Sequence, residues 1–384
     1  MPYKYKHFIR ENIAPKGAKN IVVYNNDKKV CSIPLGRLKP TKKTKNYSFG
    51  LLSDVHIAKT TDDATNKLKT AMGFFQGKVI DFLCHCGDIT NTGLWYPISE
   101  TEHTSYFDLT EIDTFYKTCK DYIDTKLIYG NAGNHESYNN YDVSNTSRLD
   151  IYGTNPNLEV NTLAEYKSFT GNDLVFTMTR ETENGDDVFI FVGQSTQQLP
   201  MDKNGETNHL QWLYDRLEEN RNKRCFVFVH SFISENDSGN PLGQHSLPLF
   251  EYWGATNTKV FTDMMAHYKN TILFHGHSHV HFLAQEQVSH AIYSTNLGFR
   301  SVHVPSSANG RRLLDNGSGG YTLEGKNPEF SLGYYIEVYD NSIVLNGIDF
   351  MNNESVPIGT YEIDTTLVEI EEKTFIDSTG TIKT

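Results

Sequence analysis

Side chains suited to holding divalent metal ions recur at five places between residues 54 and 279. The seven candidate ligands are Asp54, His56, Asp88, Asn134, His230, His277 and His279. Carboxylate oxygens, imidazole nitrogens and amide oxygens are the donors that hard and borderline divalent cations accept in proteins. Seven donors are more than one tetrahedral or octahedral site can use if it must also admit water and substrate. The set therefore predicts two metal sites that share a ligand.

Asp88 is the expected bridge between the two sites, because a carboxylate offers two oxygens. Two ions about 3.5 to 4 Å apart would hold a hydroxide between them and polarise a phosphoryl oxygen. The predicted chemistry is hydrolysis of a phosphate ester by attack of this metal-bridging hydroxide. Manganese is the metal we expect, with iron, zinc, nickel and cobalt as alternatives, since all of them accept mixed nitrogen and oxygen ligands.

Each ligand cluster directly follows an apolar run that is typical of a buried strand. The runs are Tyr47–Leu52, Val79–Leu83, Lys126–Tyr129, Cys225–Val229 and Thr271–Phe274. In layered α/β domains, ligands bind where the carboxyl ends of neighbouring strands open into loops. We therefore expect the five clusters to converge at one edge of the strands.

Other periodic segments supply the rest of the predicted fold. Helical spacing of apolar residues predicts helices over Thr61–Phe75, Glu111–Ile123, Thr207–Asn220 and Phe261–Tyr268. Further β-type runs predict a second sheet from Asp173–Thr179, Asp187–Val192, Ala291–Thr295, Ser301–Val304, Tyr334–Tyr339 and Ser342–Ile348. The stretch Asn91–His103 is predicted to be a long loop of the kind that often faces substrate.

Charge and composition divide the chain into three parts. Residues 1–46 carry 12 Lys and Arg against Glu11 and Asp27, a balance of +10, so the total of −12 leaves −22 for the remainder. We expect a basic leader with a β-hairpin over 1–46, a catalytic-type domain over 47–364 and an acidic tail over 365–384. The leader is either an attachment arm or a solvated terminus.

Composition excludes several classes of protein. No apolar stretch approaches the roughly 20 residues that span a bilayer, so no membrane partner is expected. The five cysteines are an odd number and widely spread, which favours reduced thiols in a cytoplasmic compartment. An acidic body is also a poor general binder of phosphate backbones, so nucleic acid is a less favoured partner than a small phosphodiester or nucleotide.

The ordered motifs resemble those of the calcineurin-like metallophosphoesterase superfamily. The matching blocks are Asp54-x-His56, Gly87-Asp88, Gly133-Asn134-His135-Glu136, His230, and Gly276-His277-Ser278-His279. The resemblance implies a four-layer αββα sandwich, between the α+β and α/β classes, in which helices flank two mixed sheets. It also implies one metal held by Asp54, His56, Asp88 and His279, and a second held by Asp88, Asn134, His230 and His277. His135 would contact the phosphate and act as general acid.

Departures from the family pattern narrow the subclass. The resemblance implies an Asp-Arg pair after the bridging aspartate in protein phosphatases, whereas this chain has Asn91 and Thr92. A phosphodiester is therefore favoured over a monoester, and the chain looks closest to the bacterial and phage branch. We expect a cytoplasmic protein of a bacterial host, or a virion-associated one if it is phage-encoded. In the phage case the leader would dock on a particle or another copy.

Each motif also has an alternative explanation in which its residues have only a structural role. A single buried Asp or His is usually a satisfied core group, but five such blocks in order are hard to explain in that way. The main alternative function is a phage or prophage structural or binding protein that keeps the fold without the activity. A nuclease of the same superfamily is a third reading, and it requires a basic groove.

Overall fold

The computed structural model describes 15 segments of the chain. They are residues 20–25, 28–34, 44–58, 63–91, 95–97, 105–107, 109–137, 170–171, 173–183, 185–193, 209–231, 259–288, 291–317, 321–325 and 327–375. The chain divides into two compact units, Met1–Thr44 and Lys45–Thr384. In the first unit, β1 (Asn20–Asn25) pairs antiparallel with β2 (Lys28–Pro34), so the expected hairpin is present.

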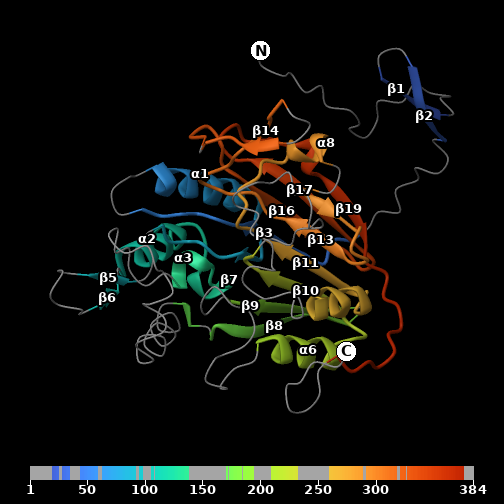
Figure 1. Ribbon diagram of the computed structural model, residues 1–384, viewed down its shortest axis with the longest axis horizontal. Helices are drawn as coiled ribbons and strands as arrows, with labels where there is room; N and C mark the ends of the chain where they lie inside the picture. Colours follow the sequence, from blue (N-terminus) through green and yellow to red (C-terminus); the bar gives the residue numbers. More distant parts are fainter. Residues whose placement is uncertain are drawn as a thin grey trace. The chain divides into compact units, whose positions relative to one another are not determined.

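Two large sheets form the second unit (Figure 1). The first sheet has seven strands: β18 (Glu354–Ser355), β17 (Ser342–Asp349), β16 (Leu332–Val338), β3 (Tyr47–Leu52), β4 (Phe82–His85) and β7 (Ile128–Gly130) in spatial order, with β19 (Tyr361–Asp364) on β17. The second sheet has six: β12 (Tyr293–Ser294), β13 (Arg300–His303), β11 (Thr271–His275), β10 (Arg224–Val229), β9 (Gly185–Val192) and β8 (Val175–Thr182). Both sheets mix parallel and antiparallel pairs.

The inner faces of the sheets pack on each other through aromatic side chains. Phe49 of β3 stacks on Phe82 of β4 with ring centroids 5.2 Å apart, and its edge meets Phe189 of β9 at 5.5 Å. Both pairs belong to one buried cluster that contains residues from both sheets. The sheets are therefore the two central layers of the unit.

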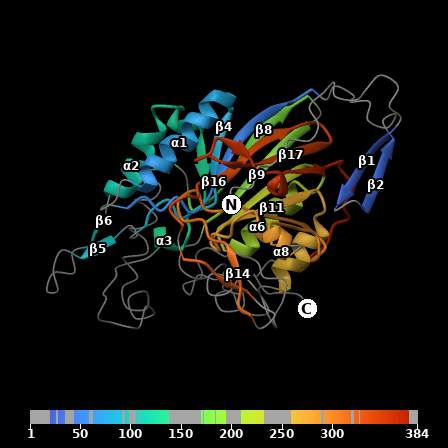
Figure 2. The same ribbon diagram turned by 90° about the horizontal axis from the view of Figure 1, so that it is seen from above.

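Helices cover the two outer faces, which completes four layers (Figure 2). On the first sheet lie α1 (Asp63–Lys78) and α2 (Leu109–Cys119), whose buried side chains share a cluster with β3, β4 and β7. On the second sheet lie α6 (His209–Glu219) and a helix over 259–267. The expected multilayer sandwich is confirmed, but the predicted runs Tyr334–Tyr339 and Ser342–Ile348 form β16 and β17 of the first sheet and not of the second. No helix among the described residues is long and apolar enough to cross a membrane.

Short elements complete the described chain. They are η2 (Thr125–Leu127), α3 (Asn134–Ser137), α8 (Ala284–Gln287) and η4 (Pro357–Gly359), with β14 (Leu313–Asp315) paired to β15 (Tyr321–Leu323). The predicted loop after Asn91 contains β5 (Trp95–Pro97), which pairs with β6 (Ser105–Phe107) just beyond it. That prediction was wrong over Trp95–Pro97, because an antiparallel pair forms there.

The start of the second predicted strand was also wrong. Val79 and Ile80 favour strand by residue type, but α1 extends to Lys78 and β4 begins only at Phe82. Val79 is 80% exposed and has a left-handed backbone with φ 56°, so it ends the helix where glycine is usual. β-Branching is thus a weak guide at a helix end.

Candidate metal centre

The strand ends bring six of the seven candidate ligands to one place. β3 and β4 run parallel, as do β4 and β7 in the first sheet and β10 and β11 in the second. The loops that follow them are also joined: the Asp54 N–H donates to the Gly87 carbonyl at 3.1 Å, and the Gly276 N–H donates to the His230 carbonyl at 3.0 Å. Each ligand therefore leaves from an anchored turn at the carboxyl edge.

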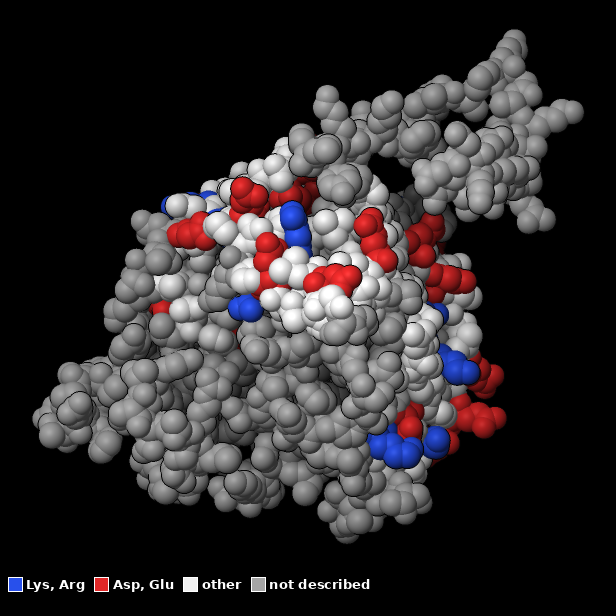
Figure 3. All heavy atoms as spheres, turned by 45° about the horizontal axis from the view of Figure 1, so that its top comes forward, with Lys and Arg blue, Asp and Glu red and all other residues white. Residues whose placement is uncertain are grey.

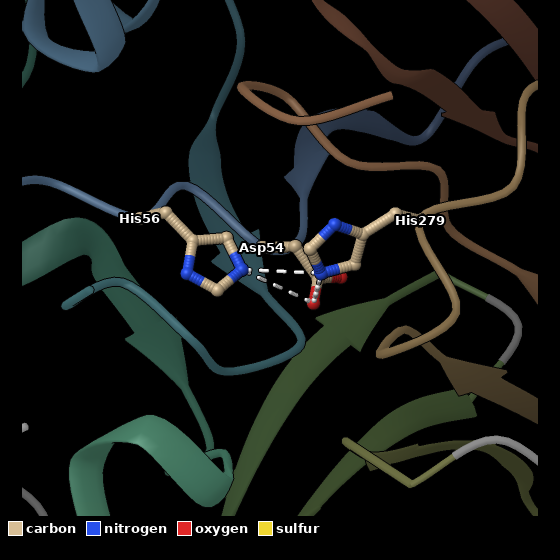
Figure 4. Close-up of side chains that lie close together, drawn as sticks. All are labelled: Asp54, His56 and His279. Atoms are coloured by element: carbon tan, nitrogen blue, oxygen red, sulfur yellow. Dashed lines mark hydrogen bonds and ion pairs between the residues drawn. The ribbon is translucent and has the colours of Figure 1, made fainter. Parts of the chain in front are cut away.

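Asp54, His56 and His279 form the first group, called here the Asp54 group. Their ligand atoms lie within 4.8 Å of one another. His279 Nε2 is 3.0 Å from Asp54 Oδ1 and 3.1 Å from His56 Nε2. Figure 4 shows the two imidazole rings pointing toward each other beside the Asp54 carboxylate. Two imidazole nitrogens and one carboxylate oxygen thus face a common point, as ligands of one cation do.

Asp88, His230 and His277 form the second group, called here the Asp88 group. Their ligand atoms also lie within 4.8 Å of one another. His230 Nε2 is 3.1 Å from Asp88 Oδ2 and 3.2 Å from His277 Nδ1. His230 Nδ1 lies 2.6 Å from the Cys86 carbonyl, a contact that fixes the ring orientation. The second group has the same donor chemistry as the first.

One oxygen of Asp88 lies near both groups. Asp88 Oδ2 is 3.9 Å from His56 Nε2 and 3.1 Å from His230 Nε2. The other oxygen, Oδ1, accepts the backbone N–H of His135 at 2.8 Å. Oδ2 is therefore the atom of Asp88 that lies near both groups. Asn134 begins α3, but its side chain lies outside the described part of the structure.

The backbone at the ligands adopts conformations that L residues rarely take. Five ligands have positive φ: Asp54 (51°), His56 (48°), Asp88 (52°), His277 (71°) and His279 (61°). Such conformations cost roughly 1–3 kcal/mol each and cluster at functional sites. Gly133 permits another close approach, since a Cβ there would lie 2.2 Å from Asp88 Oδ1. The conformations that orient these side chains therefore lower the stability of the folded protein.

Glu136 holds the ligand turns together, although sequence reasoning gave it no role. Its buried carboxylate accepts backbone N–H groups from Asp88 (2.8 Å), Gly133 (2.7 Å) and Thr90 (2.8 Å). Both oxygens are used, so the turn after β4 and the turn before α3 share one anionic anchor. The sequence signal was its place at the end of the block Gly133-Asn134-His135-Glu136.

Ser53 is a second residue that sequence reasoning missed. Its hydroxyl donates to Asp54 Oδ2 at 2.5 Å, and the backbone N–H of His277 donates to the same oxygen at 3.0 Å. Asp54 therefore has one oxygen held by hydrogen bonds and the other, Oδ1, turned toward His279. This division orients the carboxylate as a ligand.

His135 lies beside the centre and is partly exposed, and its ligand nitrogen lies within 4.8 Å of the ligand atoms of His56 and Asp88. Its side chain is 22% exposed, and Nε2 is 3.9 Å from Asp88 Oδ2. Its Nδ1 lies 2.6 Å from the Asn91 carbonyl; because a carbonyl oxygen can only accept a hydrogen bond, Nδ1 carries the hydrogen and donates it. Nε2 is left directed at the site.

The pKa shifts of His56, His277 and Asp54 suit cation binding. Burial and the neighbouring His135 and His279 hold the pKa of His56 well below its usual value, and burial with the nearby His230 lowers the pKa of His277 to about 3. Burial alone would raise the pKa of Asp54, but His279, His230 and His56 bring it well below the usual range. Neutral imidazoles and an ionised carboxylate are the forms that bind metal. Burial lowers the pKa of His230, but Asp88 and Asp54 outweigh it and raise the pKa to about 9, so His230 would release a proton when a cation binds. The residues present therefore fit a pair of divalent ions.

One known protein family matches most of the second unit. A family model described as calcineurin-like phosphoesterase matches residues 47–281. That range includes all seven candidate ligands. No curated protein matched the chain.

Solved structures with related folds share little sequence with this chain. A dimetal phosphatase from Danio rerio is 14% identical, with a TM-score of 0.46 over 84% of this chain and 100% of that one. GAP50, the anchor in the inner membrane complex of Plasmodium, is 12% identical, with a TM-score of 0.49 over 87% and 92%. Yfce, a phosphoesterase from E. coli, is 9% identical, with a TM-score of 0.32 over 83% and 100%.

Proposed function

The chain belongs to the calcineurin-like phosphoesterase family, and on that premise we propose that it is a binuclear, metal-dependent phosphodiesterase that acts on a nucleotide-type substrate. The observation that carries the proposal is the position of Asp88 Oδ2, which lies near both ligand groups. Two clusters of imidazoles that meet at one carboxylate would suit a pair of ions close enough to act on one phosphoryl group.

The distances between ligand atoms support the assignment of the ligands to two ions. Asp54, His56 and His279 would hold one, the Asp88 group would hold the other, and Asp88 would serve both. We propose Asn134 as a further ligand of the second ion, on the basis of the family motif. When bound, the ions supply an activated water molecule and neutralise negative charge on the phosphoryl oxygens.

The chain's own residues supply the acid. His135 carries a hydrogen on Nδ1 that is shared with the Asn91 carbonyl, and its Nε2 faces the centre. In the doubly protonated form, Nε2–H would donate to the departing alkoxide oxygen as the ester bond breaks. The His135 N–H bond to Asp88 Oδ1 keeps this acid at a fixed place relative to the junction.

A diester substrate is supported by the residues that follow Asp88. Asn91 and Thr92 stand where the family's protein phosphatases have an Asp-Arg pair, so the cation that helps to bind a monoester dianion is missing there. The described surface in Figure 3 shows acidic side chains spread over the face, with basic ones scattered among them. A long polyanion gains little from such a surface. Small cyclic or linear nucleotides are therefore the preferred class, and manganese is the preferred metal.

Matched aryl esters test the proposal directly. The chelated protein would be reconstituted with Mn and assayed on an aryl phosphodiester and on the monoester with the same leaving group. We expect turnover of both and a higher kcat/KM for the diester. A higher kcat/KM for the monoester would remove the diester preference, and no turnover of either with two ions bound would remove the enzymatic proposal.

A further inference from the structure

The segment after β13 wraps around the Asp54 group. The Ser307 N–H donates to the Ser53 carbonyl at 3.0 Å, and the Ser306 hydroxyl donates to the Asp54 carbonyl at 2.8 Å. A few residues further on, the Arg311 N–H donates to the His279 carbonyl at 2.9 Å. Residues 306–311 therefore touch the backbone on both sides of this group, and their side chains include one cation.

Arg311 is held tightly by its backbone. Its carbonyl accepts the His281 N–H at 2.7 Å, so Arg311 pairs with the ligand turn through both its N–H and its carbonyl. The side chain is half-buried, and its Nε is enclosed without a hydrogen-bond partner. Among the described residues, the Arg311 guanidinium makes no hydrogen bond or ion pair.

The neighbouring cations are engaged elsewhere. Lys67, on α1, is buried, donates to the Ala308 carbonyl at 2.8 Å and pairs with Asp63 at 3.1 Å. Arg312 lies over the Phe330 ring, 4.7 Å from its centroid. Of these three cations around residues 306–312, Arg311 alone has no partner in the described part of the chain.

A half-buried guanidinium without an anion is costly, because burial removes water and no carboxylate replaces it. Burial lowers the pKa of Arg311, and Asp54 acts in the opposite direction. The guanidinium thus lies within electrostatic range of the Asp54 carboxylate without pairing with it. The structure leaves this cation beside the metal centre with its hydrogen-bonding capacity unused.

We propose that Arg311 binds a non-bridging oxygen of the substrate's phosphoryl group at the Asp54 side of the centre. The inference rests on the proposed function, since it assigns the ligand of the same site. A guanidinium suits this task because it donates two parallel hydrogen bonds to a phosphate and stays charged. Arg311 would therefore supply one cation on the Asp54 side of the centre, where it would contact a single non-bridging oxygen.

The test uses the Mn-loaded full chain and inorganic phosphate as the probe. Phosphate affinity is measured by calorimetry for the wild type, Arg311→Gln, Arg311→Lys and the matched control Arg312→Gln, with metal content determined for each. We expect Arg311→Gln to weaken phosphate binding roughly 10- to 100-fold and to raise KM for esters, with two ions retained. Arg311→Lys should fall between Arg311→Gln and the wild type, and Arg312→Gln should stay within about twofold of the wild type.

The outcomes separate this inference from the proposed function. Wild-type affinity in Arg311→Gln overturns the role of Arg311, even if the esters are hydrolysed. If Arg311→Gln loses metal or fails to fold, Arg311→Lys decides, and wild-type phosphate affinity with two bound ions overturns the role. A wild type that binds no phosphate also overturns it. If the wild type hydrolyses no ester, the proposed function fails, while the difference in phosphate affinity still tests Arg311.

Discussion

The backbone N–H of His135 donates to Asp88 Oδ1 at 2.8 Å, while Asp88 Oδ2 lies 3.1 Å from His230 Nε2. One carboxylate therefore positions the proposed acid with one oxygen and faces the ligand groups with the other. This relationship makes the two-metal proposal specific, because changes at Asp88 and at His135 should have different consequences.

Replacing Asp88 with Asn should abolish tight binding of two ions. The amide removes the negative charge at the position shared by the groups, and only one of its two terminal atoms is an oxygen. Changes to residues that merely orient metal ligands cost about 10- to 100-fold in metal affinity or activity, so the loss of a shared ligand should exceed ~100-fold. Metal content after gel filtration and kcat/KM for an aryl diester measure both effects. Two retained ions with a wild-type rate would rule out the shared ligand.

Replacing His135 with Ala should affect the reaction according to the leaving group. An alkyl ester needs its departing oxygen protonated, whereas a nitrophenolate leaves readily without help. We expect roughly 10²- to 10⁴-fold slower hydrolysis of poor leaving groups and a much smaller loss for activated aryl esters. A series of aryl and alkyl diesters measures the difference, with metal content as the control. Equal losses across the series would show that His135 is not the acid.

Replacing Glu136 with Gln should destabilise the fold around the ligands. The carboxylate accepts three backbone N–H groups, and the amide must turn a donor toward at least one of them. A buried donor left unsatisfied costs about 1–3 kcal/mol, and more when a charged partner is lost. Chemical denaturation measures the change in unfolding free energy. Glu354→Gln, an exposed position on β18, is the matched control and should stay within about 0.5 kcal/mol of the wild type. Similar small effects in both variants would contradict the anchoring role.

Chelation should lower the thermal stability of the protein. Ions that bind only the folded state stabilise it by mass action, by about 2.7 kcal/mol for each site when the free metal is at 100 times its Kd. We expect the melting temperature to fall on chelation and to return on Mn addition in the wild type. Asp88→Asn should recover less at the same metal concentration. If the melting temperature of the wild type is the same with and without Mn, the clusters are packed polar groups that do not bind metal.

Strand patterns predicted where in the fold the candidate ligands would meet. Apolar runs such as Cys225–Val229 and Thr271–Phe274 correspond closely to β10 and β11, because strands buried on both faces read as continuous apolar segments. Polar residues directly after such strands must emerge at one edge, and Asp54, Asp88 and His230 do meet there.

Contacts between segments far apart in sequence were not predictable. The three N–H groups on the Glu136 carboxylate depend on turn geometry, and Arg311 has no periodic signal that links it to Asp54. The predicted acidic tail is a further example: residues 365–375 lie against the outer helices, with Ile370 and Phe375 buried in their cluster. Two apolar side chains in an acidic stretch are too few to reveal such packing.

The central claim, that two ions act together in ester hydrolysis, is tested most directly by stepwise reconstitution. Metal-free protein receives Mn in fractions of one equivalent, and aryl diester turnover and bound metal are measured at each step. The account predicts little turnover while the first equivalent binds, a rise as the second binds, and no rise in Asp88→Asn. Full turnover at one equivalent, or none with two ions bound, would contradict it.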